Sequence, residues 1–235
     1  MLTGRSVCWT VLQATEPFLN RETTMADIRA GRTTKEEVLK DFRTGEIVQA
    51  ARRVIGELGF ADASMERIAH EAGVAKGTIY LYFRNKEELL AQVVDHGFAV
   101  MMERARAGAG RARGAEAKLA ALLCVALEHS AENQAIFRAL QEHRQLAPEN
   151  PPLLAAKLEH NLEQLVSFVA GMIERGTKSG ELRACDARRA ARFLVESMRG
   201  AILERLREPK RSSVQADAAT IVDFFLHGVG ATEPS

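Results

Sequence analysis

Lys76, Thr78 and Tyr80, at alternate positions, are the side chains best suited to chemistry in this chain of 235 residues. A cation, a hydroxyl and a phenol that follow one another so closely can donate hydrogen bonds to phosphate oxygens and to base edges. Gly77 lies among them and has no side chain, so the backbone there can approach a phosphate closely. These residues indicate contact with nucleic acid.

Two short helices are needed to present these side chains. The first is expected to follow Ser64, whose hydroxyl can cap it, and to end at Gly73, which supplies a left-handed residue before Val74 fills the corner. Apolar residues between these ends recur at the i, i+3, i+4, i+7 spacing of a buried face: Met65, Ile68, Ala69 and Ala72.

The second helix is expected to begin at about Ala75, which offers no hydroxyl cap and so forgoes about 1 kcal/mol. Its Ile79 and Phe83 are four residues apart and must face inward, which leaves the polar and aromatic side chains outside. The pair is a helix-turn-helix with a polar second helix. Asn85 and Glu88 then form a capping signature where a third helix starts.

The stretch from Ile68 to Leu89 resembles the DNA-binding signature of the tetracycline-repressor (TetR) family of bacterial regulators. The matching residues are I-A-x-x-A-G-V-x-K-G-T-I-Y-x-Y-F-x-x-K-E-x-L, and the similarity extends from about residue 44 to about residue 94. For Tyr82, packing across the outer surface of its helix is the alternative to contact with DNA. Lys86, at a helix start, is expected to anchor a phosphate. The DNA-binding set is expected to be Ser64, Lys76, Gly77, Thr78, Tyr80, Tyr82 and Lys86.

Composition restricts the other classes of protein. A hydrophobic content of 46% supports a real core, and the formal net charge of +1 gives no general basic surface, so placement of charge must favour DNA instead. Three scattered cysteines indicate neither a disulfide framework nor a zinc site. No two of the six histidines are spaced as a ligand pair, and no catalytic triad order is found, so no cofactor, metal or enzyme activity is expected. No apolar run is long enough to cross a membrane, and we expect a cytoplasmic protein.

The chain is expected to be all-α with two domains. Residues 1–32 are interpreted as a mobile arm, and translation could instead start at Met25. Residues 33–92 would form the helix-turn-helix domain, with a capping box at Thr34 and Glu37, and residues 93–235 a regulatory domain. Gly108, Gly110 and Gly114 are expected to mark a boundary, because three glycines within seven residues disfavour a continuous helix. Later helices are expected at about 115–131, 133–146, 151–177, 186–207 and 214–228.

The regulatory domain is expected to bind a small apolar molecule among the helices that span residues 115–177. Three apolar stripes there carry isolated polar groups, the usual composition of a ligand pocket, although such residues can equally fill a core. The expected pocket wall is Leu123, Leu127, Phe137, Leu140, Leu165, Phe168 and Met172.

The last two helices carry more apolar surface than one chain needs, which predicts a homodimer about a two-fold axis. Two reading heads would then recognise a palindrome. The alternative is that these stripes are buried within one subunit. The expected interface is Leu194, Met198, Ile202, Ile221, Phe224 and Phe225.

Together these features predict a transcriptional regulator, a repressor that a small molecule releases from a palindromic operator in double-stranded DNA. A regulator controlled by a partner protein, or by nothing, is the alternative within the same fold. An all-helical enzyme or scaffold is the alternative from another class.

Overall fold

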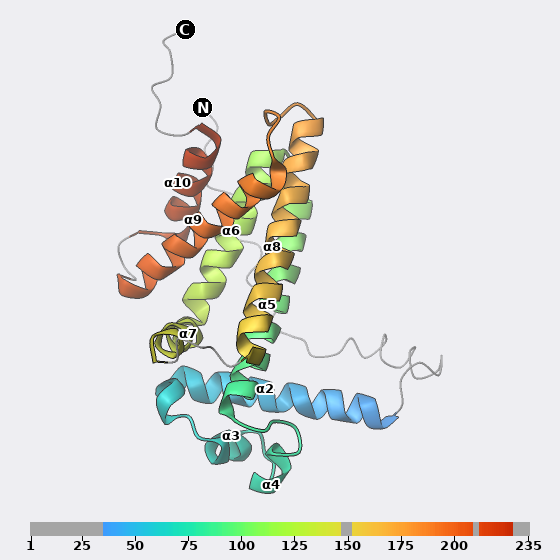
Figure 1. The fold of residues 1–235 in the computed structure, drawn as a ribbon, viewed down its shortest axis with the longest axis vertical. Helices are drawn as coiled ribbons and strands as arrows, with labels where there is room; N and C mark the ends of the chain where they lie inside the picture. Colours follow the sequence, from blue (N-terminus) through green and yellow to red (C-terminus); the bar gives the residue numbers. More distant parts are fainter. Residues whose placement is uncertain (1–34, 147–151, 209–211, 228–235) are drawn as a thin grey trace. The chain divides into compact units, whose positions relative to one another are not determined.

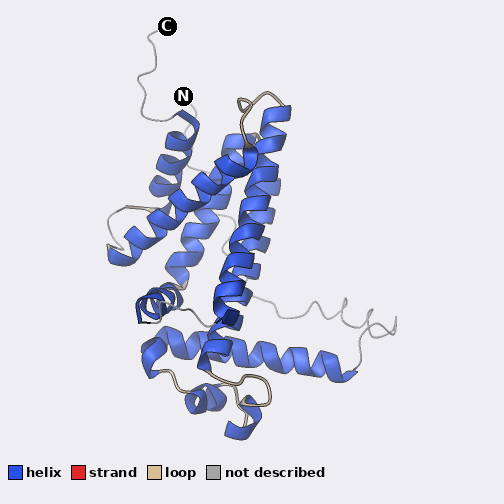
Figure 2. Ribbon diagram, viewed as in Figure 1, coloured by secondary structure: helices blue, strands red, loops and turns tan. Residues whose placement is uncertain are grey.

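The computed structural model describes residues 35–146, 152–208 and 212–227. Every element in these ranges is a helix, as Figure 2 shows, which confirms the all-α prediction. The predicted arm, Met25 and Thr34 lie outside them. No helix among the described residues is long and apolar enough to cross a membrane.

The chain divides into two compact units, residues 1–47 and residues 48–235. The division between units falls within the first described helix, α2 (Lys35–Asp62), which bends at Gly59. The predicted boundary at residue 92 concerns a different division, between DNA reading and regulation, and it stays a prediction.

Two short helices, α3 (Met65–Glu71) and α4 (Lys76–Ile79), follow α2, and the long helix α5 (Lys86–Arg111) begins after them. The remaining helices are α6 (Ala115–Glu132), α7 (Gln134–Leu146), α8 (Pro152–Lys178), α9 (Ala187–Arg207) and α10 (Val214–His227). Each lies within two residues of its predicted ends.

One apolar core joins α5, α6, α8, α9 and α10. In Figure 1, α5, α6 and α8 run along one another, and α9 crosses α8 and α6. Leu119, Leu122 and Val166 are among the side chains that lie almost wholly inside this core. Apolar stripes on these helices explain the packing, because each helix can bury its stripe only against its neighbours.

The glycine-rich segment was predicted wrongly in part. Gly108 and Gly110 lie within α5, which continues to Arg111, and only Gly114, with a φ of 84°, interrupts the chain before α6. A Cβ atom on Gly108 would lie 3.7 Å from the Cβ of Ala121, so this glycine lies at a close contact between α5 and α6. Tertiary packing thus offsets the low helix propensity.

The start of α6 and the end of α8 are tied together. The Oε2 of Glu181 accepts a hydrogen bond from the backbone N–H of Ala115 over 2.6 Å, which lowers the pKa of the carboxyl group. A Cβ atom on Gly176 would lie only 2.8 Å from the Cβ of Ala115, so the two helices almost touch there. Among the glycines that the structure describes, Gly176 has the least room for a side chain.

Candidate nucleic-acid interface and effector pocket

The helix-turn-helix forms, but its second helix is shorter than predicted: α4 ends at Ile79, and Phe83 lies beyond it. Ser64 caps α3 by accepting a hydrogen bond from the N–H of Arg67 over 3.2 Å. Gly73 has a φ of 66°, the left-handed value that a non-glycine residue avoids, and Val74 donates a backbone hydrogen bond to Ala69 over 2.9 Å. A joint of this kind fixes the direction in which α4 leaves α3.

The first turn of α4 is open. Ala75 is its N-cap and makes no side-chain capping bond, as predicted, so the hydroxyl-free end keeps unsatisfied N–H groups. Lys76 and Gly77 are exposed, and a Cβ atom on Gly77 would have no neighbouring atom of the chain within 4 Å. Ile79 is fully buried and holds the inner face of the helix. The outer face therefore offers room for a polymer surface.

A turn after α4 carries three large side chains in succession. Tyr80 is 45% exposed, Leu81 is 79% exposed and Tyr82 is half-buried. The prediction included both tyrosines but omitted Leu81, the most exposed large apolar side chain of the described residues. An apolar side chain between two tyrosines on a polar face was the available signal, because apolar atoms can contact a thymine methyl group.

An acid lies beside the predicted phosphate contact. The Nζ of Lys76 is 2.5 Å from the Oε1 of Glu66 on α3, and both side chains are at least half exposed. This hydrogen bond lowers the pKa of Glu66 and raises the pKa of Lys76, so both groups are charged at neutral pH. Lys76 is thus partly neutralised while no DNA is bound.

Lys86 has a partner that the sequence did not reveal. Its Nζ donates to the backbone carbonyl of Phe60 over 2.6 Å and to that of Ala61 over 3.1 Å, and it lies 4.5 Å from the centre of the Phe60 ring. The ammonium group therefore stabilises the end of α2. One further donor is left for a phosphate, so the anchor stays a prediction with a structural role beside it.

The cap of α5 also forms. Asn85 Oδ1 accepts from the N–H of Glu88 over 2.8 Å, as predicted. The Glu88 carboxylate accepts from the N–H of Arg84 over 2.7 Å, one residue earlier than the usual reciprocal bond. Both bonds hold the start of α5 beside α4.

The expected pocket wall is brought into one region but is largely filled. Leu123, Leu127, Leu165 and Met172 are at most 5% exposed and belong to the core, whereas Phe137 and Phe168 are half-buried against it and Leu140 is half-exposed. The structure thus supports the core interpretation for the four buried residues. Only Phe168 and Met172 line an open cavity.

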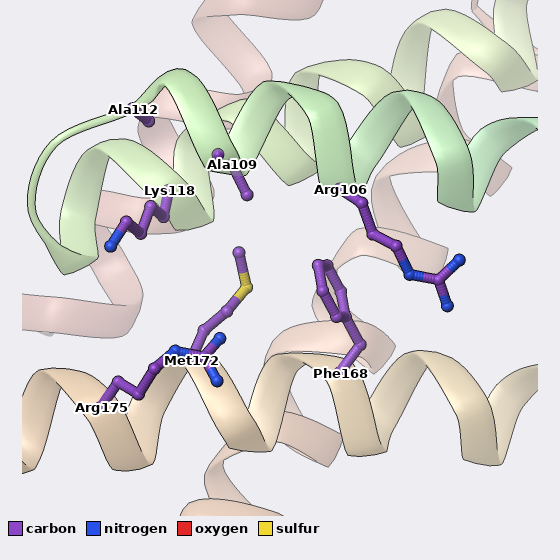
Figure 3. A pocket seen from close by; sticks show the side chains of 8 residues that line it. Arg106, Ala109, Ala112, Lys118, Phe168, Met172 and Arg175 are labelled. Carbon is purple, nitrogen blue, oxygen red and sulfur yellow. The ribbon is translucent and has the colours of Figure 1, made fainter.

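That cavity lies between α5 and α8 and measures about 310 Å³. Figure 3 shows Phe168 and Met172 rising from α8 into the space opposite Ala109. Gly110 and Ala112 complete the apolar lining, and the polar lining is Arg106, Lys118 and Arg175. The sequence reasoning missed these three cations, which come from three different helices and have no shared spacing.

The predicted dimer interface needs a correction. Leu194, Met198 and Ile202 are between 1% and 7% exposed, because α6 and α8 of the same chain cover this face of α9. They are core residues and leave almost no side-chain surface for a partner subunit. Ile221 and Phe225 pack partly against the same core. Phe224 is 56% exposed, and Phe193 on α9 is 62% exposed.

Polar contacts connect α2 to α5 and to the end of α6. The Nη1 of Arg52 donates to the Oδ1 of Asn133 over 2.9 Å, and Asn133 is the C-cap of α6. One turn earlier on α2, Gln49 Nε2 lies 3.0 Å from the Nε2 of His96 on α5. The amide of Asn133 also donates to the carbonyl of His129 over 2.9 Å. A movement of α6 would therefore displace the hydrogen-bond partner of Arg52 on α2, the helix that precedes the helix-turn-helix.

Comparisons with known proteins identify the family to which the helix-turn-helix region is similar. Residues 47–93 match the family model for bacterial regulatory proteins of the tetR family. The fatty acid metabolism regulator protein of Bacillus subtilis is 28% identical over 187 residues, which cover 78% of this chain and 94% of the relative. The regulator BetI of Brucella anthropi is 30% identical over 55% of this chain and 72% of its own length.

A solved structure shares the architecture as well. The structure of the regulator FadR from Bacillus subtilis in complex with stearoyl-CoA superposes with a TM-score of 0.68, at 25% identity, over 79% of this chain and 98% of FadR. The match thus extends beyond the helix-turn-helix to the later helices. The chain therefore belongs to the TetR family of bacterial transcriptional regulators.

Proposed function

We propose that this regulator is a repressor that binds a palindromic operator as a homodimer and leaves it when a fatty acyl thioester of coenzyme A binds. Residues 33–92 read the operator, and residues 93–235 bind the effector and the partner subunit. The protein acts where the chromosome is, in the cytoplasm.

The exposed outer face of α4 carries the proposal for DNA. Lys76 and Thr78 supply a cation and a hydroxyl at an open helix start, and Gly77 permits close approach of a phosphate. Tyr80 and Leu81 extend beyond them toward base edges. Ser64, Tyr82 and Lys86 surround this face and make contacts with the sugar-phosphate backbone.

Relatives support the class of effector. The Bacillus subtilis relative is named as a regulator of fatty acid metabolism, and the FadR structure holds stearoyl-CoA. An effector of this kind combines a long apolar chain with an anionic group. The cavity between α5 and α8 has both characters, since Phe168 and Met172 are apolar and three lining residues are cations.

The homodimer is supported by exposed apolar side chains on the last two helices. Phe193 and Phe224 are each more than half exposed. Large aromatic side chains in water are typical of a surface that another protein covers. A second copy of the same helices is the simplest cover, because a two-fold axis presents each patch to its equal.

A fluorescence anisotropy titration tests the proposal. Labelled DNA from the region upstream of the gene is expected to bind far more tightly than random DNA of the same length, and stearoyl-CoA is expected to release it. Equal affinity for both DNAs would reject sequence-specific binding. An operator complex that stearoyl-CoA leaves intact, while stearate or another small apolar molecule releases it, would reject the effector class only.

A further inference from the structure

We propose that the cavity between α5 and α8 is the mouth of the effector site, where Arg106, Lys118 and Arg175 bind the phosphates of the effector headgroup. The inference rests on the proposed function and adds to it the part of the molecule that the protein recognises by charge. A repressor with this mouth selects a phosphorylated amphiphile over a free fatty acid.

Charge in the cavity is one-sided. Three of its eight lining residues are cations, and none of the eight described residues that line it is acidic. Two cations elsewhere on these helices have acidic partners: Arg104 contacts Glu132, and Lys157 contacts Asp95, within 2.7 Å in each case. Like charges gathered around one hollow repel one another, so an anion that enters is stabilised by all three.

Lys118 has one acidic influence nearby, and that acid is engaged elsewhere. The pKa of Glu181 is lowered mainly by the hydrogen bond from Ala115 and then by the one from Ser179. The charge of Lys118 makes the smallest contribution. Its Oε2 accepts from the N–H of Ala115, and its Oε1 accepts from the Ser179 hydroxyl over 2.8 Å. The Lys118 ammonium therefore keeps its hydrogen-bonding capacity for a ligand.

Each of the two arginines is exposed and has one contact beside the cavity. The guanidinium carbon of Arg106 lies 5.8 Å from the centre of the Phe168 ring. An Nη1 atom of Arg175 lies 3.3 Å from the position that a Cβ on Gly171 would occupy, so the side chain folds back over its own helix. Figure 3 shows Arg106 at one end of the cavity and Arg175 with Lys118 toward the other. Two planar guanidinium groups on opposite sides of a hollow suit separate phosphates of one headgroup.

The face of α8 that lines the cavity continues to one buried polar group without a partner. Leu165 and Asn161 continue the face of α8 that carries Phe168 and Met172, and Asn161 is seven residues, about 10 Å, from Phe168 along the helix. Asn161 is 6% exposed, and its Nδ2 has no hydrogen-bond partner among the described residues. A buried donor without an acceptor is rare, and an acceptor group on the ligand stem would satisfy it.

Calorimetry on the full chain tests the mouth with three probes: stearoyl-CoA, CoA without an acyl chain, and stearate. Arg106→Gln with Arg175→Gln is the test variant, and Arg113→Gln with Arg207→Gln removes the same charge from two exposed positions outside the cavity. Each lost charge-assisted bond is expected to weaken stearoyl-CoA binding roughly ten- to 100-fold. The control variant is expected to bind stearoyl-CoA like the unmodified protein, and stearate affinity is expected to be the same in all three proteins.

Three results would overturn the inference. Equal stearoyl-CoA affinity in the test variant and the unmodified protein would reject the mouth while the proposed function stands. Equal losses in both variants would show general electrostatics in place of a site. If the unmodified protein binds stearate but not stearoyl-CoA, both the mouth and the proposed effector class fail. Release of operator by stearoyl-CoA, measured in parallel, separates these cases.

Discussion

Arg52 on α2 and Asn133 at the end of α6 are joined by one hydrogen bond of 2.9 Å, between Nη1 and Oδ1. The bond connects the helix that precedes the helix-turn-helix to the C-cap of α6, a core helix that belongs to the proposed regulatory domain. Two regions that exchange a ligand signal need contacts of this kind, with different strengths in the bound and free states.

We predict that Arg52→Ala reduces the response to the effector more than it reduces DNA binding. Couplings of this type amount to about 1–3 kcal/mol, and one exposed charge-assisted hydrogen bond can supply a large part of that. Operator affinity with and without stearoyl-CoA, measured by anisotropy, gives the coupling as a ratio. Arg53→Ala is the control, because Arg53 contacts Glu71 on α3 instead. A ratio that falls equally in both variants would contradict this role for Arg52.

Glu66 is predicted to weaken DNA binding through its contact with Lys76. Replacement by Gln removes one negative charge beside the phosphates and frees the ammonium group. Affinity for any DNA is then expected to rise roughly fivefold, with a steeper dependence on salt. The comparison is Glu71→Gln, which removes an equal charge that pairs with Arg53. Identical salt slopes for the two variants would show that Lys76 does not contact a phosphate.

Phe224 gives the sharpest test of the homodimer. Its side chain is 56% exposed, so Phe224→Glu should leave the folded subunit intact while it places a charge in an apolar interface. We expect the variant to sediment as a monomer at low micromolar concentration and to bind the operator weakly, because one reading head contacts half the site. Ala219→Glu places the same charge on another exposed face of α10 and should stay dimeric. A monomeric unmodified protein would end the hypothesis without any variant.

Burial lowers the pKa of His129 from 6.5 to about 4. The ring packs edge-on against Phe137 and against the backbone of Gly97, where a charged imidazolium would be poorly solvated. Below about pH 6.5 His129 of the unfolded chain binds a proton, whereas His129 of the folded chain does not bind one until about pH 4. The free energy of unfolding therefore falls across this window. The effect is present in full above the window and lost as the pH drops through it.

We therefore predict that His129→Gln makes stability less sensitive to acid. Between about pH 7 and about pH 5, the unmodified protein should lose about 2 kcal/mol more than the variant in urea denaturation. His160→Gln, on an exposed position of α8, should follow the unmodified protein. Parallel curves for all three proteins would mean that His129 is solvated in the folded state.

Local features of the reading head could be predicted because their causes lie within a few residues. Ser64, Gly73 and Asn85 act on backbone groups no more than four positions away, and such caps are visible in the sequence. The destination of Lys86 could not be predicted in this way. Its carbonyl partners are 25 and 26 residues earlier, at the end of a helix whose direction depends on tertiary packing.

For the helices from α5 onward, the sequence says even less about long-range partners. An apolar stripe such as Leu194 to Ile202 predicts burial correctly but does not say whether the cover comes from the same chain or from a partner. The charged cavity was invisible for the complementary reason, since Arg106, Lys118 and Arg175 meet only when α5, α6 and α8 pack together. Helix periodicity reports which face is buried and leaves the neighbour unspecified.

The tie between Ala115, Gly176 and Glu181 makes the start of α6 a pivot. The 18 residues of α6 form a rod about 27 Å long, with the pivot at one end and Asn133 at the other. A rotation of only about 5° about such a pivot displaces the far end by roughly 2 Å, more than a hydrogen bond tolerates. Lys118 lies within one turn of the pivot, so the proposed headgroup acts close to the fixed end of α6. Arg52 contacts Asn133 at the opposite end, where the same rotation produces the larger displacement.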